Sequence, residues 1–204
     1  MATILLNGVV TDATTLTGTD LADKLTVSGG VDGIEANLLG ADDLIEVEAN
    51  GEDSDSTLRG GEGDDVINVT AGNPEEIDFV TPQNISGSLI GGPGADTIAM
   101  GDGLAVLTGT IKGNEDDDTI TLANADGGFV QGNSGDDTIT LGFGAGYGTA
   151  AGSRAVASFT DASINGSGGD DTINIDDVVS EILDYQVDGI IVASVSMSSD
   201  LAAR

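Results

Sequence analysis

The chain has 204 residues, of which 36 are acidic and five are basic, and its formal net charge at pH 7 is -31. Proteins that bind nucleic acid or an anionic membrane surface need clustered Lys or Arg, and five bases scattered along the chain provide no cluster. The absence of Cys and His excludes Cys/His zinc sites and Ser-His or Cys-His nucleophile pairs. A metal site would have to be built from carboxylate and carbonyl oxygens.

The composition indicates a folded chain, because 39% of the residues are apolar and a disordered chain of this charge would have far fewer. The N-terminus lacks a basic segment, and Asn7, Gly8 and Thr11 interrupt its apolar residues. It therefore resembles neither a signal peptide nor a membrane span. We expect a protein that is exported without a cleaved N-terminal leader.

In chain order, the sequence predicts one domain in three parts. Residues 1–15 are apolar and β-rich, which predicts an N-terminal cap or edge strand; residues 16–175 contain the repeats; residues 176–204 form a C-terminal cap or assembly segment. Two weak relatives of the repeat open the second part. Residues 18–26 keep its outline and residues 40–45 are shortened, so we interpret both as decayed or capping versions.

A nine-residue phrase then occurs five times, at residues 60–68, 91–99, 113–121, 132–140 and 166–174. Its glycine-rich first half predicts a turn, since glycine permits positive φ and close backbone approach. Its second half alternates polar and β-branched residues, which predicts a short strand with one buried face. The predicted inward residues, with those of the weak relatives, are Leu25, Ile45, Ile67, Ile98, Ile120, Ile139 and Ile173.

The spacing of these residues predicts an all-β fold, a parallel β-solenoid of the β-roll or β-helix type. The steps between them are 20, 22, 31, 22, 19 and 34 residues, so each coil of roughly 20 residues has about one motif turn. The two long steps predict loops near residues 73–84 and 142–153. A second strand precedes each motif, with inward candidates Leu58, Ile90, Ile111, Val130 and Ile164.

The phrase resembles the GGxGxDxUx nonapeptide of RTX proteins, which form a parallel β-roll with calcium bound in the turns. The copies that begin at Gly60 and Gly91 fit at every position, whereas those at Gly132 and Gly166 lack only the second glycine. The remaining copy also has Asp116 in place of the fourth glycine. RTX repeats usually run in tandem, and here they are separated.

Stacked turns with a carboxylate at one position would place negative charges about 5 Å apart, the spacing of strands, and calcium is the simplest neutraliser. The expected side-chain ligands are Asp65, Asp96, Asp118, Asp137 and Asp171, with Asp64, Asp117, Asp136 and Asp170 as second choices. The turn residues assigned to the same sites are Gly60, Gly61, Gly63, Gly91, Gly92, Gly94, Gly113, Asp116, Gly132, Asn133, Gly135, Gly166 and Gly169. Plain turns without an ion remain the alternative.

A repeat with the same residues in every coil favours a repeated physical task over a single active centre, so we expect no enzyme. We expect a secreted, calcium-binding structural protein that assembles with itself into, or decorates, an extracellular filament, surface layer or matrix. Residues 3–6 and 187–195 would cap the solenoid or make end-to-end contacts. The alternatives are a decoration protein on a virion surface, an adhesion or polysaccharide-binding module and, lacking the expected basic cluster, a β-helix polysaccharide lyase.

Overall fold

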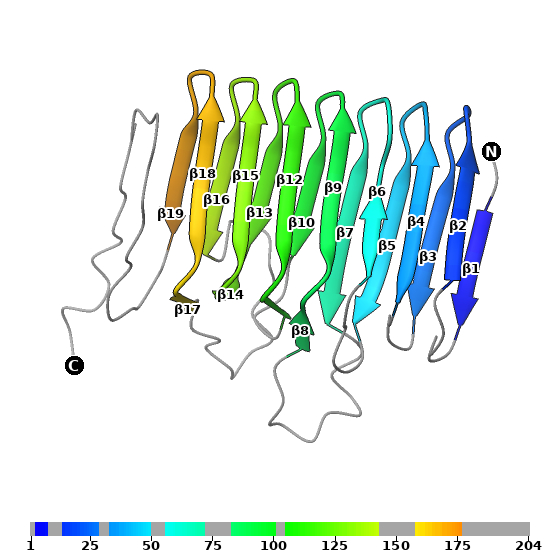
Figure 1. Ribbon diagram of the computed structural model, residues 1–204, viewed down its shortest axis with the longest axis horizontal. Helices are drawn as coiled ribbons and strands as arrows, with labels where there is room; N and C mark the ends of the chain where they lie inside the picture. Colours follow the sequence, from blue (N-terminus) through cyan, green and yellow to red (C-terminus); the bar gives the residue numbers. More distant parts are fainter. Residues whose placement is uncertain are drawn as a thin grey trace.

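The computed structural model describes residues 3–7, 14–28, 33–49, 56–71, 83–100, 105–142 and 158–176, which form strands and turns without a helix. The strands run side by side from β1 at one end of the row to β19 at the other (Figure 1). In this part of the chain, no helix has the length and apolar character needed to cross a membrane. The predictions for residues 187–195, and for most of both long loops, lie outside these ranges.

All strand pairs are parallel, and the strands form three sheets. The eight-stranded sheet contains, in order, β1 (Thr3–Asn7), β3 (Lys24–Ser28), β5 (Leu44–Ala49), β7 (Val66–Ala71), β10 (Thr97–Met100), β13 (Thr119–Leu122), β16 (Thr138–Gly142) and β19 (Thr172–Asp176). The seven-stranded sheet contains β2 (Thr14–Thr19), β4 (Ile34–Leu39), β6 (Thr57–Arg59), β9 (Ser88–Pro93), β12 (Thr110–Glu115), β15 (Phe129–Ser134) and β18 (Ser163–Gly168). The four-stranded sheet contains β8 (Gln83–Ile85), β11 (Ala105–Leu107), β14 (Asn124–Asp126) and β17 (Ser158–Thr160).

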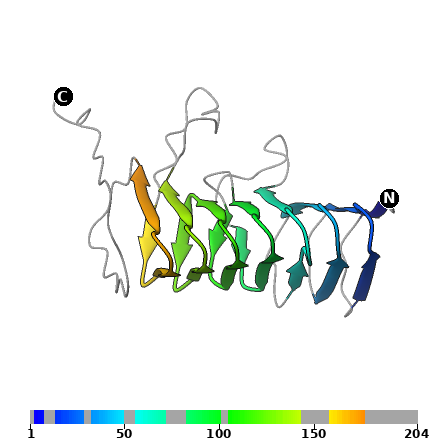
Figure 2. The ribbon, with the colours of Figure 1, turned by 90° about the horizontal axis from the view of Figure 1, so that it is seen from above.

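The sheets are the faces of one solenoid, because successive strands in the chain belong to different sheets. We number its coils by their strands: coil 1 is β2 and β3, coil 2 is β4 and β5, and coil 3 is β6 and β7. Coil 4 is β8 to β10, coil 5 is β11 to β13, coil 6 is β14 to β16, and coil 7 is β17 to β19 (Figure 2). The predicted parallel β-solenoid, with one motif turn per coil, is confirmed.

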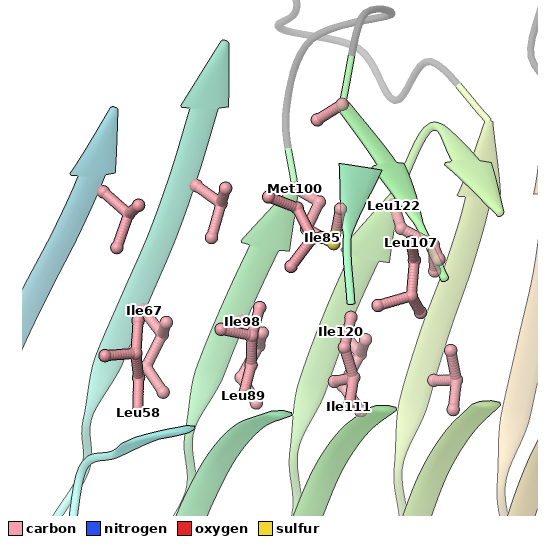
Figure 3. Packing of buried hydrophobic residues seen from close by; sticks show 14 of the residues in the cluster. Leu58, Ile67, Ile85, Leu89, Ile98, Met100, Leu107, Ile111, Ile120 and Leu122 are labelled. Carbon is pink, nitrogen blue, oxygen red and sulfur yellow. The ribbon is translucent and has the colours of Figure 1, made fainter. Parts of the chain in front are cut away.

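The core is a narrow stack of aliphatic side chains between the sheets, seen in part in Figure 3. Its first row pairs residue by residue across the eight-stranded sheet: Leu25, Ile45, Ile67, Ile98, Ile120, Ile139 and Ile173. All seven are buried, as the sequence predicts. Because burial of one such side chain contributes about 1.5–3 kcal/mol, this row alone is a large part of what holds the coils together.

The second predicted row is correct at four positions and wrong at one. Leu89, not Ile90, pairs with Leu58 on one side and Ile111 on the other. Leu89 is 3% exposed, whereas Ile90 pairs with Arg59 and Lys112 on the outer face. Two adjacent apolar residues hide the alternation, and an error of one residue reverses the face. The inward residue lies two positions before the first motif residue in each of these coils.

Candidate metal-binding turns

Each coil crosses from the seven-stranded to the eight-stranded sheet through a turn in the motif, and the seven stacked turns form what we call the turn edge. Between β9 and β10, for example, the turn is residues 94–96, at motif positions four to six. In coils 4 to 7 the first three motif residues belong to the preceding strand, so for these coils the prediction that the whole glycine-rich half is a turn was too broad. Main-chain bonds join neighbouring coils here: Gly61 N–H donates to Gly91 O at 3.1 Å, and Gly63 N–H to Pro93 O at 2.9 Å.

Left-handed backbone occurs at the second and fourth motif positions. In coil 4 these are Gly92, with φ 143°, and Gly94, with φ 131°. In coil 5 the same positions hold Asn114 at φ 105° and Asp116 at φ 73°. Asn and Asp tolerate this region better than other residues with a side chain. The copy with Asp116 therefore keeps left-handed backbone where the motif has its fourth glycine.

The sixth motif position forms a column of buried aspartates inside the turn edge, which we call the aspartate column. Its members are Asp23, Asp43, Asp65, Asp96, Asp118, Asp137 and Asp171, each at most 3% exposed. Each main-chain N–H donates to Oδ1 of the aspartate in the next coil: Asp23 to Asp43 at 2.6 Å, Asp43 to Asp65 and Asp65 to Asp96 at 2.8 Å, Asp96 to Asp118 and Asp118 to Asp137 at 2.9 Å, and Asp137 to Asp171 at 3.0 Å. The structure thus brings all five predicted ligands into one line.

The second oxygen of these carboxylates is not paired. Within the described part of the chain, Oδ2 is buried and has no hydrogen-bond partner in Asp43, Asp65, Asp96, Asp118, Asp137 and Asp171. Leaving such an oxygen buried and unpaired costs about 1–3 kcal/mol, and more when it is charged. A bound cation or a proton at each of these six oxygens would therefore stabilise the column.

The first glycine of the motif makes room for these carboxylates. A Cβ on it would collide with the aspartate Oδ2 of its own motif in six coils: Gly18 with Asp23, Gly60 with Asp65, Gly91 with Asp96, Gly113 with Asp118, Gly132 with Asp137, and Gly166 with Asp171. None of these glycines has positive φ. In these coils the first position therefore requires glycine for space, whereas in coils 3 to 7 the second and fourth positions favour it for backbone conformation. Coil 2 is the exception, because Leu38 stands at its first position.

Burial raises the pKa of the inner carboxyls from the ordinary value of 3.8, to about 7 for Asp65, about 6 for Asp96, about 8 for Asp118 and about 6 for Asp137. The main-chain N–H from the preceding coil partly offsets this rise. Repulsion from the neighbouring carboxylates adds to it; Asp96 and Asp137 raise the pKa of Asp118 in this way. Without a bound cation, the carboxyls of Asp65 and Asp118 therefore hold protons for part or most of the time near neutral pH.

Two members of the column, Asp23 and Asp43, were missed as site residues. The relative at residues 40–45 is not shortened, because Leu39 pairs with Thr19 in the sheet and so fills the second motif position. Leu38 fills the first position. The signal that could have identified both aspartates is their distance of two residues from the inward residues Leu25 and Ile45, the same as in the five clear copies.

The acids at the fifth motif position lie on the outside of the turns. Asp64, Asp117, Asp136 and Asp170 are exposed. Where another such turn follows, Oδ1 accepts the N–H of the next coil: Asp64 from Ala95 at 3.0 Å, Asp117 from Asp136 at 2.8 Å, and Asp136 from Asp170 at 2.8 Å. These second-choice ligands thus join the coils by hydrogen bonds, in the opposite direction to the aspartate column.

In the ranges that the structure covers, no three Asp or Glu side chains come together as a group that could hold a metal ion. The turn edge offers one buried carboxylate oxygen per turn instead, so most ligands of a cation would be main-chain carbonyls. Calcium accepts such mixed oxygen sets in flexible geometry, whereas magnesium requires a near-ideal octahedron. The donor chemistry and the unpaired Oδ2 atoms therefore fit calcium.

The resemblance to RTX proteins is confined to the nonapeptides. As a whole, the chain matches no protein-family model, no curated protein and no solved structure. Its function therefore has to be inferred from the geometry of the turn edge.

Proposed function

We propose that this chain is a non-catalytic, calcium-binding structural protein that assembles with itself or decorates a surface in a calcium-rich extracellular environment. Calcium would bind along the turn edge and act as the counter-charge of the aspartate column. The ions would make the stacking of the coils favourable, so that the solenoid is rigid where calcium is plentiful.

The observation that carries this proposal is the set of buried Oδ2 atoms without a hydrogen-bond partner. A single unpaired oxygen could be a local defect, but this one recurs in coils 2 to 7, and in coils 3 to 7 it lies beside a glycine where a Cβ has no room. The residues that would hold calcium are Asp43, Asp65, Asp96, Asp118, Asp137 and Asp171, together with main-chain carbonyls of the turns. Its chemistry there is to supply positive charge to carboxylates that otherwise repel one another and take up protons.

Two observations support a structural role. The aspartate column repeats one arrangement in each coil from coil 2 to coil 7, whereas a catalytic centre would need one arrangement different from the rest. Within the described residues, the end strands β1 and β19 of the eight-stranded sheet pair on one side only. An open parallel edge can be extended by a strand of another chain.

Thermal unfolding followed by circular dichroism tests the calcium proposal, with millimolar calcium, with the same concentration of magnesium, and with chelator. A ligand at 100 times its dissociation constant adds about 2.7 kcal/mol per independent site. We expect calcium to raise the midpoint strongly and magnesium to raise it little. A midpoint that is the same in calcium and in chelator would mean that the motifs are ordinary turns.

Light scattering coupled to size-exclusion chromatography tests the assembly part separately. We expect oligomers or filaments in millimolar calcium and smaller species in chelator. A monomer that binds calcium would rule out self-assembly and leave decoration of another surface as the structural role.

A further inference from the structure

The outer face of the seven-stranded sheet has one continuous row of side chains at the position just before the motif, which we call the face row. In coils 3 to 5 it consists of Arg59, Ile90 and Lys112, register partners on the neighbouring strands β6, β9 and β12 (Figure 1). The two cations are partly exposed and lie on strands about 10 Å apart. In the described part of the chain neither of them forms an ion pair, whereas Lys24 pairs with Glu46. The complete face row is Thr17, Asn37, Arg59, Ile90, Lys112, Gln131 and Asn165.

The fifth motif position forms a second row along the same axis, on the outside of the turn edge, which we call the edge row. Oδ1 of Asp64 accepts the N–H of Ala95, and Oδ1 of Asp117 accepts that of Asp136. Oδ2 of Asp64 and of Asp117 makes no hydrogen bond to the described residues, so one oxygen of each is free to bind another molecule. The complete edge row, exposed throughout, is Ala22, Asp42, Asp64, Ala95, Asp117, Asp136 and Asp170.

The two rows match coil by coil. The edge row has an aspartate in coils 2, 3, 5, 6 and 7, and in each of these coils the face row has a side chain with N–H donors: Asn, Arg, Lys, Gln and Asn, in that order. Coils 1 and 4 have alanine in the edge row, and their face-row residues, Thr17 and Ile90, have no N–H donor in the side chain. Two unrelated rows would rarely agree in all seven coils.

This match is not used within one copy, because no ion pair joins a face-row cation to an edge-row aspartate in the part of the chain that is described. Both rows repeat at the spacing of the strands, so the edge row of one copy can lie along the face row of another. With the coils in register, the cations of coils 3 and 5 face Asp64 and Asp117, and Ile90 faces Ala95.

The match also favours one polarity. An antiparallel contact centred on coil 4 would place Thr17 opposite Asp170 and Asn165 opposite Ala22. The aspartate would then face no N–H donor, and the amide would face no carboxylate. In the parallel arrangement every aspartate of the edge row faces a donor.

We propose that the edge row of one copy docks on the face row of a second copy, with the solenoid axes parallel and the coils in register. Each copy then uses its edge for one neighbour and its face for another. Such a contact is heterologous, and it forms a ring or an open layer of parallel solenoids, depending on the angle between neighbours. The inference rests on the proposed function, because bound calcium reduces the net charge of -31 that keeps two copies apart.

Analytical ultracentrifugation in millimolar calcium tests the contact with two double variants. The face variant is Arg59→Glu with Lys112→Glu, and the edge variant is Asp64→Lys with Asp117→Lys. We expect each variant alone to associate at least about tenfold more weakly than wild type, since two ion pairs become contacts between like charges. The edge variant is less negative than wild type, so stronger association of this variant would show that only general repulsion matters and would overturn the proposal.

Combining the variants tests whether the two rows meet. An equal mixture of the face and edge variants should associate again, because each reversed row then finds an opposite charge on the other protein. The protein with all four changes should also associate, and its net charge equals that of wild type. Failure of both to recover association would contradict the pairing of the rows, as would assembly of either double variant at the wild-type level, which is the result expected of end-to-end contacts.

Thermal unfolding in calcium and in chelator separates this inference from the proposed function. A midpoint that calcium raises in wild type and in both double variants shows that all three proteins are folded and bind calcium. A wild type with this rise that stays monomeric overturns the lateral contact alone, whereas a wild type without it overturns the calcium proposal. Asp64→Asn with Asp117→Asn keeps the acceptor oxygens of the turns and removes the charges, so it should weaken association even if the Lys substitutions disturb the turns.

Discussion

Coils 1 to 3 and coils 4 to 7 differ in cross-section but share one turn edge. The described part of coils 1 to 3 has two strands per coil, whereas coils 4 to 7 add a third strand that belongs to the four-stranded sheet. The step between coils 3 and 4 is 31 residues and that between coils 6 and 7 is 34. The aspartate column nevertheless continues through both regions, with hydrogen bonds of 2.6–3.0 Å.

This comparison shows which part of the coil fixes the stacking. Chain length and strand number vary away from the turn edge, while the motif positions stay in register from Leu25 to Ile173. Insertions are tolerated where coils meet only through aliphatic packing and sheet bonds, since loop length costs little free energy. The turn edge varies less, because the carboxylates from Asp65 to Asp171 each accept the N–H of the preceding coil and lie beside a glycine.

The largest expected effect is the pH dependence of stability without calcium. The carboxyls of coils 3 to 6 have pKa values of about 6 to 8, above the ordinary 3.8. Between about pH 4 and pH 8 the folded state therefore binds more protons than the unfolded state, and the free energy of unfolding falls as pH rises through this window. The midpoint measured in chelator should be higher at pH 5 than at pH 8.

General repulsion among the 36 acids also lowers the free energy of unfolding as pH rises. A measurement at individual residues is therefore needed to isolate the contribution of the buried carboxyls. Hydrogen exchange at Ile120 in coil 5 should become faster with pH, beyond its intrinsic rate, more in wild type than in Asp118→Asn. Saturating calcium should remove this difference by competing with protons for the column. Equal pH dependence in both proteins in chelator would argue against protonation of Asp118.

Gly113→Ala should destabilise the fold more than the loss of a single carboxylate ligand does. Its Cβ would collide with Asp118 Oδ2, so the carboxylate must move and the column must open at that coil. Overpacking of this kind typically costs 1–3 kcal/mol, and the lost hydrogen bond to Asp96 N–H adds to it. We expect a loss of about 3 kcal/mol in denaturant titrations with calcium present.

Gly40→Ala is the matched control in the two-strand region. The nearest atoms to its Cβ would be 3.9 Å away, and Gly40 does not have positive φ. We expect a change within about 0.5 kcal/mol. A comparable loss in both variants would show that the space beside the Asp118 carboxylate is not the reason for glycine at position 113.

The effect of Asp118→Asn on stability should differ between calcium and chelator, with a loss in calcium and no loss in chelator. With calcium, the variant loses a charged ligand, and we expect a loss of about 1–2 kcal/mol. In chelator at pH 9, above the pKa of about 8, it removes a buried negative charge that Asp96 and Asp137 repel. The variant should then be as stable as wild type or more stable. A loss of equal size in both conditions would mean that Asp118 acts only through its hydrogen bond.

The sequence predicts the eight-stranded sheet of this fold better than the rest. Each aspartate precedes an inward residue by two positions, so the row from Leu25 to Ile173 could be identified from the sequence alone. Ile90 was assigned to the wrong face because two apolar residues adjoin, and the four-stranded sheet was not identified because strands such as Ala105–Leu107 are only three residues long. The hydrogen bond from Thr19 N–H to Asp23 Oδ2 could not be predicted, since it depends on the backbone conformation of that turn.

The smallest expected effect concerns coil 4, the first coil of the three-strand region, where the fifth motif position is Ala95. In coils 2, 3, 5 and 6 this residue is an aspartate that accepts the N–H of the next coil, as Asp117 does from Asp136 at 2.8 Å. Ala95→Asp would offer an acceptor to the N–H of Asp117, worth about 0.5–1 kcal/mol. Repulsion from Asp64 and Asp117 opposes this gain, and salt screens it because these side chains are exposed. We therefore expect stabilisation in about 1 M salt and none in low salt.

Ala99→Asp adds the same charge to the outer face of β10 without the acceptor, and it should give no gain at either salt concentration. If the two variants behave alike, the added aspartate contributes charge only, and a carboxylate at this exposed position does not strengthen the contact between coils 4 and 5.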